Sequence, residues 1–259
     1  EGRVVGINVM TGGNQIGFLV PVEALSKLVE GINADATGDF MTRANAVIMD
    51  QLINGQARMM GELLDDKKEW PRVTFGPLSL PGGLHPALKC WGAPAHEDKD
   101  PFKHFWSTCY NEDSVYLSDG FDTGAVFYRY DLITANDDLL LPRFYTLYEQ
   151  LFAQSGDGGN AGEGDVGNFK CHDSFVDLAG GRYKASYCLR GYKKFPMLYD
   201  AHLYLALVDQ GRTGVLITVQ TLGVTRESAL AFVRKFLANI SLAQPPATAV
   251  EAVMEGKKG

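Results

Sequence analysis

The spacing of apolar residues along the chain predicts four helices and a strand-rich middle. Asp39 directly precedes one helical stretch and is suited to be its N-cap. Apolar positions at helical spacing predict helices at 22–31, 40–66, 139–153 and 226–240. Alternating or continuous short apolar runs predict strands at 4–10, 15–20, 87–91, 104–110, 114–117, 125–133, 169–177, 182–189, 201–208 and 215–222. The sequence therefore predicts an α+β fold.

Residues 71–243 show a pattern typical of an antiparallel sheet with helices packed on one face. Two stretches of this module have the same order of features: two cysteine-bearing strands, a hairpin that contains Thr-Gly, and a helix. The Thr-Gly pairs lie at 123–124 and 213–214. An internal duplication is one explanation. A chance match is the other, because ββα units are common.

The cysteines form two pairs that are close in the sequence. Cys90 is followed by Cys109, and Cys171 is followed by Cys188, each within or beside a predicted strand. The similar separations predict two disulfides, Cys90–Cys109 and Cys171–Cys188, and therefore a periplasmic or secreted protein. The alternative is four buried thiols in a cytosolic protein.

Cys90 and Cys109 also flank two histidines, His96 and His104. These four residues are a second alternative, a zinc site with two cysteine and two histidine ligands. Their spacing matches no strong zinc signature, so the disulfide is favoured. No cofactor and no metal is expected.

The acidic composition restricts the class of partner. The net charge is −7 and no dense run of Lys or Arg occurs, which argues against nucleic acid as a partner. No apolar run approaches about 18 residues, so no membrane-spanning segment is expected. Because the chain begins with Glu1 rather than Met, we expect a processed product or a part of a longer protein.

No catalytic triad is recognisable within the chain. The five histidines are scattered, and the run His172-Asp173-Ser174 lies in a predicted strand. Neighbours in a strand point to opposite faces, so these three residues cannot form a relay by themselves. The glycine-rich loop 155–168 contains side-chain oxygens that are possible calcium ligands, although a mobile linker is the favoured interpretation: Asp157, Asn160, Glu163 and Asp165.

An aromatic group in the predicted strands has two interpretations. Aromatic residues in strands usually serve core and cross-strand packing. A ligand groove is the alternative. The group consists of Trp91, Trp106, Tyr110, Tyr116, Phe127, Tyr128 and Tyr130.

Residues 1–32 predict two short strands, a glycine-rich turn and a helix that begins near Pro21. The phrases Gly-Arg-Val-Val-Gly-Ile-Asn at 2–8 and Asn-Gln-Ile-Gly-Phe-Leu-Val-Pro at 14–21 resemble the end of a trypsin-like serine protease domain of the HtrA type. The resemblance implies the last hairpin and helix of a β-barrel. It also implies substrate contact for one strand, with Ile7, Asn8 and Val9, and for another, with Ile16, Gly17 and Phe18.

The resemblance implies the C-terminal part of a periplasmic or secreted trypsin-like serine endopeptidase whose triad lies upstream of residue 1. Its partner would be a peptide or protein substrate, or an upstream protease segment. The alternative is a non-catalytic binding or assembly module that docks on a partner through residues 1–32. The expected organisation is a barrel end at 1–32, a connecting helix at 33–70, a disulfide-bonded accessory module at 71–243 and a flexible tail at 244–259.

Overall fold

A computed structural model describes most of the chain. The described residues are 3, 5–11, 17–34, 39–97, 99–111, 114–118, 121–155 and 161–243. The predicted tail 244–259 lies outside them. By its internal contacts the chain divides into two compact units, Glu1–Asn54 and Gly55–Gly259.

The first unit contains a two-stranded antiparallel sheet and helical segments. Its strands are β1 (Gly6–Thr11) and β2 (Gly17–Pro21), and they are followed by α1 (Val22–Ala34) and the first part of α2 (Phe40–Leu64). The Asp39 carboxylate accepts hydrogen bonds from the backbone N–H groups of Met41 and Thr42, at 2.9 and 3.1 Å. The predicted N-cap is therefore confirmed.

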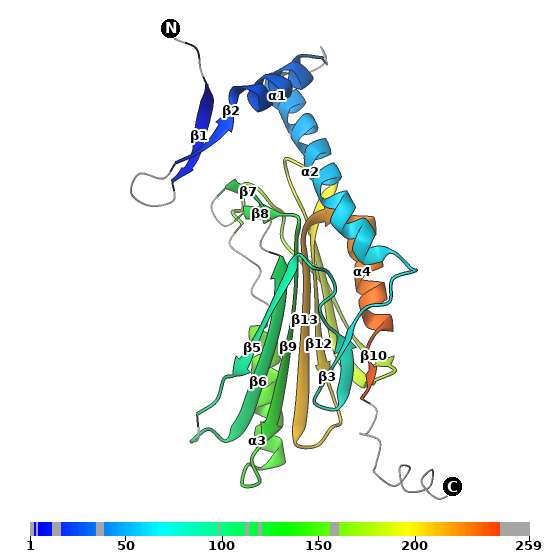
Figure 1. The fold of residues 1–259 in the computed structure, drawn as a ribbon. Coiled ribbons are helices and arrows are strands. Elements are labelled where there is room, and N and C mark those ends of the chain that lie inside the picture. The colour runs from blue at the N-terminus through cyan, green and yellow to red at the C-terminus, as the bar shows by residue number, and fades with distance from the viewer. Residues whose placement is uncertain are drawn as a thin grey trace, which may run out of the picture. The chain divides into compact units, whose positions relative to one another are not determined.

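The second unit is built on a seven-stranded antiparallel sheet with the order β10-β11-β12-β13-β9-β6-β5. Figure 1 shows these long strands side by side. Their bounds are β5 Leu88–Pro94, β6 Phe102–Asn111, β9 Ala125–Ala135, β10 Lys170–Leu178, β11 Gly181–Gly191, β12 Leu198–Leu207 and β13 Thr213–Thr225.

Smaller elements surround this sheet. The helices are α3 (Leu141–Gln154) and α4 (Arg226–Ala238). A three-stranded sheet contains β3 (Arg72–Phe75), β4 (Leu78–Pro81) and β14 (Ser241–Leu242), and a two-stranded sheet contains β7 (Val115–Ser118) and β8 (Phe121–Thr123). The α+β class is confirmed. Among the described residues, none of the helices combines the length and apolar character that crossing a bilayer requires.

Helix α4 covers one face of the sheet, which we call the α4 face. Phe232 and Phe236 of this helix are fully buried against alternate residues of the central strands. Thr225 caps the helix, because its hydroxyl accepts a hydrogen bond from the backbone N–H of Ser228. The strand residues in this core include Tyr128, Tyr130, Leu203, Leu205, Val215, Ile217 and Val219.

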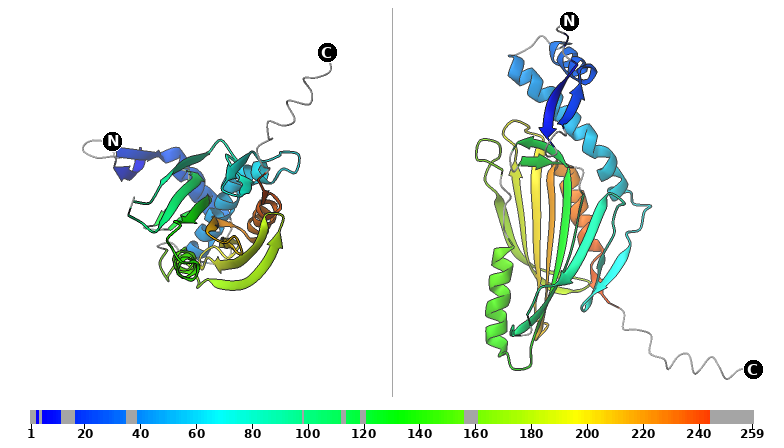
Figure 2. Two further views of the ribbon diagram at one scale, coloured as in Figure 1. Left: turned by 90° about the horizontal axis from the view of Figure 1, so that it is seen from below. Right: turned by 60° about the vertical axis from the view of Figure 1, so that its left-hand side comes forward.

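Helix α3 packs on the opposite face, so the prediction that helices cover one face only is wrong (Figure 2). At one end of β9, β12 and β13 the residues on this second face are also apolar, which gives α3 a surface to bury: Ile133, Ala206 and Leu216. The Tyr148 hydroxyl donates a 2.8 Å hydrogen bond to the Val215 carbonyl. A Cβ at Gly214 would lie 2.4 Å from the Tyr148 ring, so this contact requires glycine.

The two disulfides join residues that lie directly opposite each other in antiparallel pairs. Cys90–Cys109 links β5 to β6 with a Cα–Cα distance of 4.1 Å, and Cys171–Cys188 links β10 to β11 at 4.0 Å. This is the pairing that the sequence predicts. The linked hairpins occupy the two edges of the sheet, and β13 is central between them. The internal duplication stays a prediction.

Candidate functional site

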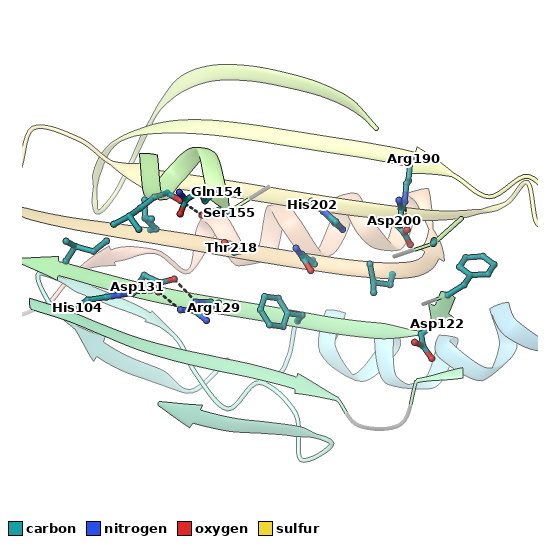
Figure 3. Close-up of a pocket in the computed structure, with 18 residues that line it drawn as sticks. His104, Asp122, Arg129, Asp131, Gln154, Ser155, Arg190, Asp200, His202 and Thr218 are labelled. Atoms are coloured by element: carbon teal, nitrogen blue, oxygen red, sulfur yellow. Dashed lines mark hydrogen bonds and ion pairs between the residues drawn. The ribbon is translucent and has the colours of Figure 1, made fainter. Parts of the chain in front are cut away.

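Helix α3 covers only one end of its face, and a cavity lies on the part that the helix leaves uncovered. We call this surface the open face. The cavity has a volume of about 520 Å³ and is lined by residues of β9, β11, β12 and β13 and by the C-terminal end of α3. Figure 3 shows charged groups on both sides of Thr218, which lies on the central strand β13.

One polar group lies on β9 and β6. The Arg129 guanidinium donates two hydrogen bonds to the Asp131 carboxylate, at 2.8 and 2.7 Å, and the ring of His104 lies 2.7 Å from the same carboxylate. Burial raises the pKa of Asp131, but the hydrogen bonds from His104 and Arg129 outweigh it and the net shift is downward. The hydrogen bond with Asp131 raises the pKa of Arg129. Asp131 is therefore ionised at neutral pH.

A second polar group lies on β11 and β12. Arg190 and Asp200 are cross-strand neighbours, and Nε of Arg190 donates a 2.7 Å hydrogen bond to the carboxylate. The Tyr192 hydroxyl and the backbone N–H of Gly223 donate to the other carboxylate oxygen, at 2.7 and 2.9 Å. Asp200 is only 1% exposed, so these bonds compensate for burying its charge.

Donors remain available on both guanidinium groups. Arg190 uses only Nε for Asp200, and its side chain is 9% exposed. Within the described part of the chain, its two terminal nitrogens have no hydrogen-bond partner, and neither does Nη1 of Arg129. The Arg190 guanidinium also lies over the ring of Phe169, 4.5 Å from its centroid. Asp200 and Phe169 therefore fix the orientation of this guanidinium at the wall of the cavity.

His202 occupies the centre of the site and is 2% exposed. Its Nδ1 lies 2.9 Å from the Tyr204 hydroxyl, and that hydroxyl also accepts a 3.5 Å hydrogen bond from Gln220. Nε2 of His202 is buried and lacks a partner among the described residues. Burial, aided by the charge of Arg190, lowers the pKa of His202 to about 4. The imidazole is therefore neutral at physiological pH.

His202 also lines a second cavity of about 330 Å³ on the same face. This cavity lies against the Cys171–Cys188 disulfide, with Lys184 and Ser186 in its wall. The histidine therefore contributes to both hollows of the open face, and its buried Nε2 has an unused hydrogen-bonding capacity.

The sequence-predicted site residues lie elsewhere. Ile7, Asn8 and Val9 belong to β1, and Ile7 is 45% exposed. Gly17 and Phe18 belong to β2, and Ile16 lies outside the described residues. Their substrate contacts stay a prediction.

The zinc alternative is wrong, because Cys90 and Cys109 are joined to each other. The described residues also contain no group of three or more metal-ligating side chains. Of the possible calcium ligands in loop 155–168, Asp157 and Asn160 lie outside the described residues, and Asp165 is 3.0 Å from Lys194.

Sequence reasoning missed the two Arg–Asp pairs. The signal was present, because Arg129 with Asp131 and Asp200 with His202 are polar residues spaced by two within otherwise apolar strands. Such spacing places both members on one face of the sheet.

No protein-family model and no curated protein matches the chain. Solved structures do match. The Ran-binding protein Mog1p of Saccharomyces cerevisiae is 13% identical with a TM-score of 0.31, over 67% of this chain and 95% of that one. LpqN of Mycobacterium tuberculosis, involved in cell envelope biogenesis, is 9% identical with a TM-score of 0.29, over 60% and 92%. PsbP of Synechocystis sp. PCC 6803 is 16% identical with a TM-score of 0.26, over 62% and 96%.

The prediction of a trypsin-like protease is corrected by these findings. None of the three matching structures is a trypsin-like protease, so neither the HtrA-type resemblance of residues 1–32 nor a serine endopeptidase function is retained.

Proposed function

We propose that the chain is a non-catalytic binding module whose open-face cavity takes a small, uncharged, oxygen-rich ligand. The observation that carries this proposal is Nε2 of His202, which is buried at the cavity without a partner. A buried polar atom costs free energy unless it is hydrogen-bonded. A ligand oxygen placed between His202 and the terminal nitrogens of Arg190 satisfies both.

The charge balance of the cavity favours an uncharged ligand. Arg129 and Arg190 are each neutralised by an aspartate within 2.8 Å. Asp122 adds a further carboxylate to the lining. An anionic ligand would meet no excess positive charge here and would lose its hydration. Hydroxyl groups suit the site better, because each both donates and accepts.

The two disulfides support an extracytoplasmic location, and we place the protein in the periplasm or outside the cell. In this proposal residues 71–243 are the binding module, 33–70 connect it to the N-terminal segment, and 244–259 are a tail.

The experiment is a thermal-shift and calorimetric screen of neutral polyols and sugars, with carboxylated and phosphorylated analogues beside them. The test variant is Arg190→Met with Asp200→Asn, which removes the guanidinium donors and keeps an oxygen acceptor for Tyr192. The control is Arg182→Met, the same residue type on the same strand but exposed and outside the cavity. We expect neutral compounds to bind, the double variant to lose at least tenfold in affinity, and the control to bind normally. Binding of anionic analogues alone would contradict the proposal.

A second function is favoured by the first unit: docking of a partner protein through residues 1–32. Val5 is 73% exposed, Ile7 45% and Val20 37%, all in or beside a two-stranded sheet. A two-stranded sheet is marginally stable alone and has open edges. We propose that a partner adds an extended strand to it, which would pair the backbone and cover these side chains.

A photo-crosslinking residue at Ile7, with one at the 42% exposed Val73 of the second unit as control, tests this docking. We expect a defined adduct from Ile7 only, with a protein that binds the wild type and loses affinity for Ile7→Lys. Equal labelling from both positions, or no adduct at Ile7, would overturn it.

A further inference from the structure

A row of aromatic rings leads from the cavity to the edge of the sheet. Phe127 on β9 lines the cavity. Tyr110 on β6 is its direct cross-strand partner. Tyr110 in turn stacks on Trp91 of β5, with the ring centroids 4.9 Å apart and an interplanar angle of 25°. The row therefore crosses three adjacent strands, a distance of roughly 10 Å.

These rings lie on the open face. Directly paired residues of an antiparallel sheet share a face, so Tyr110 lies on the same face as Phe127. The neighbouring Tyr128 is instead buried in the core of the α4 face. Tyr110 is 40% exposed and Trp91 is 43% exposed. The stacked pair is thus presented to solvent.

A hydrogen-bonding group lies beside the row. Trp106 is four residues before Tyr110 on β6 and so shares its face, and the Arg129 guanidinium lies over the Trp106 ring, 5.1 Å from the centroid. Nη1 of Arg129 has no partner among the described residues. The aromatic row therefore lies beside a hydrogen-bond donor at the wall of the cavity.

We infer that the ligand is an uncharged oligosaccharide, an inference that rests on the proposed function. One terminal sugar occupies the cavity and places hydroxyl groups on His202 and Arg190. The next sugars cross β6 and β5 and lay the C–H faces of their rings on Tyr110 and Trp91. Sugars combine an apolar ring face with hydroxyl groups that donate and accept, and this surface offers partners for both.

Single-stranded nucleic acid also stacks on aromatic side chains, but it requires a positively charged groove. The chain carries a net charge of −7, and Arg129 beside the row is paired with Asp131. The charge of this surface therefore favours the oligosaccharide.

An array of neutral glycans that covers the common linkage types, followed by calorimetry with the best hexasaccharide and its monosaccharide, tests the inference. The variants are Trp91→Ala and Tyr110→Ala. Phe105→Ala is the matched control, because Phe105 lies on β6, is 40% exposed and has the opposite parity to Tyr110 in that strand. We expect about tenfold weaker hexasaccharide binding in each variant. Monosaccharide affinity should be unchanged, and the control should bind within about twofold of the wild type.

The outcomes separate this inference from the proposed function. If no glycan on the array binds while a small neutral polyol does so through Arg190 and Asp200, the inference is wrong and the proposed function stands. If hexasaccharide and monosaccharide bind equally, or if Phe105→Ala weakens binding as much as Trp91→Ala, the aromatic row has no role. Preferential binding of oligo-dT would assign the row to nucleic acid and overturn the inference. If neither glycans nor polyols bind, both fail.

Discussion

The two faces of the seven-stranded sheet are made by the same strands and differ in what covers them. On the α4 face, alternate residues of β9, β11, β12 and β13 are apolar or tyrosine and are buried beneath α4. On the open face, the residues between them include Arg129, Asp131, His202 and Thr218, and α3 covers only the end where the strands are apolar. The α4 face is an apolar core along the length of these strands, whereas the open face carries the charged groups that line the cavity.

This difference shows how one strand can contribute to stability and to binding through alternating residues. Because successive side chains point to opposite faces, a polar residue at every second position leaves the core pattern intact. Tyr130 between Arg129 and Asp131 is 1% exposed and belongs to the core, although both neighbours face the cavity. Substitutions on the two faces should therefore have separable effects.

The largest difference in unfolding free energy is expected between alanine substitutions of two phenylalanines, one on each face. Phe236 is fully buried and packs against the rings of Trp70, Tyr128, Tyr130 and Phe232. Phe236→Ala should lower the free energy of unfolding by about 3–5 kcal/mol, because it removes a core ring and leaves a cavity. Phe127→Ala on the open face should cost about 1 kcal/mol and weaken ligand binding instead. Urea denaturation measures both, and equal losses would remove the distinction between the faces.

Breaking the buried ion pair Arg190–Asp200 should cost more stability than breaking the partly exposed pair Arg129–Asp131. Asp200→Ala should cost about 3–5 kcal/mol, because it leaves Arg190 charged and buried. Asp131→Ala should cost less, since the Arg129 side chain is 36% exposed and can be hydrated.

The double variant Arg190→Met with Asp200→Asn sharpens this prediction. It should recover most of the stability that Asp200→Ala loses, because no buried charge remains. Ligand affinity should not recover. If the double variant is as unstable as Asp200→Ala, the cost comes from the lost carboxylate hydrogen bonds rather than from the stranded guanidinium.

The disulfides offer a comparison between the two edges of the sheet. Replacing Cys171 and Cys188 by alanine, or Cys90 and Cys109, should each cost about 3 kcal/mol in the chain-entropy account, because the sequence separations are 17 and 19. Only the first replacement should also alter binding of a monosaccharide or small polyol, since Cys171 and Cys188 line the second cavity beside His202. Denaturation and calorimetry on both variants check this, and a binding loss in the Cys90–Cys109 variant alone would contradict it.

Stability should also depend on pH, through the buried His202. The pKa of His202 is lowered to about 4 by burial, against about 6.5 in an unfolded chain. As the pH falls below about 6.5, the unfolded chain binds a proton that the folded protein does not. Stability should therefore decrease between about pH 6.5 and pH 4, by at most on the order of 3 kcal/mol. His202→Gln should flatten this slope in urea denaturation curves, and an unchanged slope would show that His202 titrates normally.

Much of the fold could be predicted from the sequence. Helical spacing predicted 40–66 and 226–240 close to the observed α2 and α4, and alternation located the strands of the large sheet. The sequence also predicted a helix at 139–153, close to α3, but not the face of the sheet on which α3 packs. This packing depends on apolar residues that β9, β12 and β13 contribute together at one end of the open face, and on Gly214, which admits the Tyr148 ring.

Less of the candidate site could be predicted from the sequence. His104 and His202 were visible as isolated histidines, but their surroundings come from long-range strand pairing. Arg190 meets Asp200 through the register of β11 and β12, which periodicity alone does not specify. The short match at residues 1–32 pointed to a protease that the matching structures do not support.

The most direct test is an NMR titration of the isotope-labelled protein with the best neutral polyol or monosaccharide from the screen. The account predicts a shift of the His202 Nε2 signal as it gains a hydrogen bond, with backbone shifts confined to residues near Arg129, Asp131, Arg190 and Thr218. Signals from Phe232 and Phe236 of the α4 face should not move. Shifts centred on α4, or saturation of binding with the His202 ring signals unchanged, would contradict the assignment of the open-face cavity as the binding site.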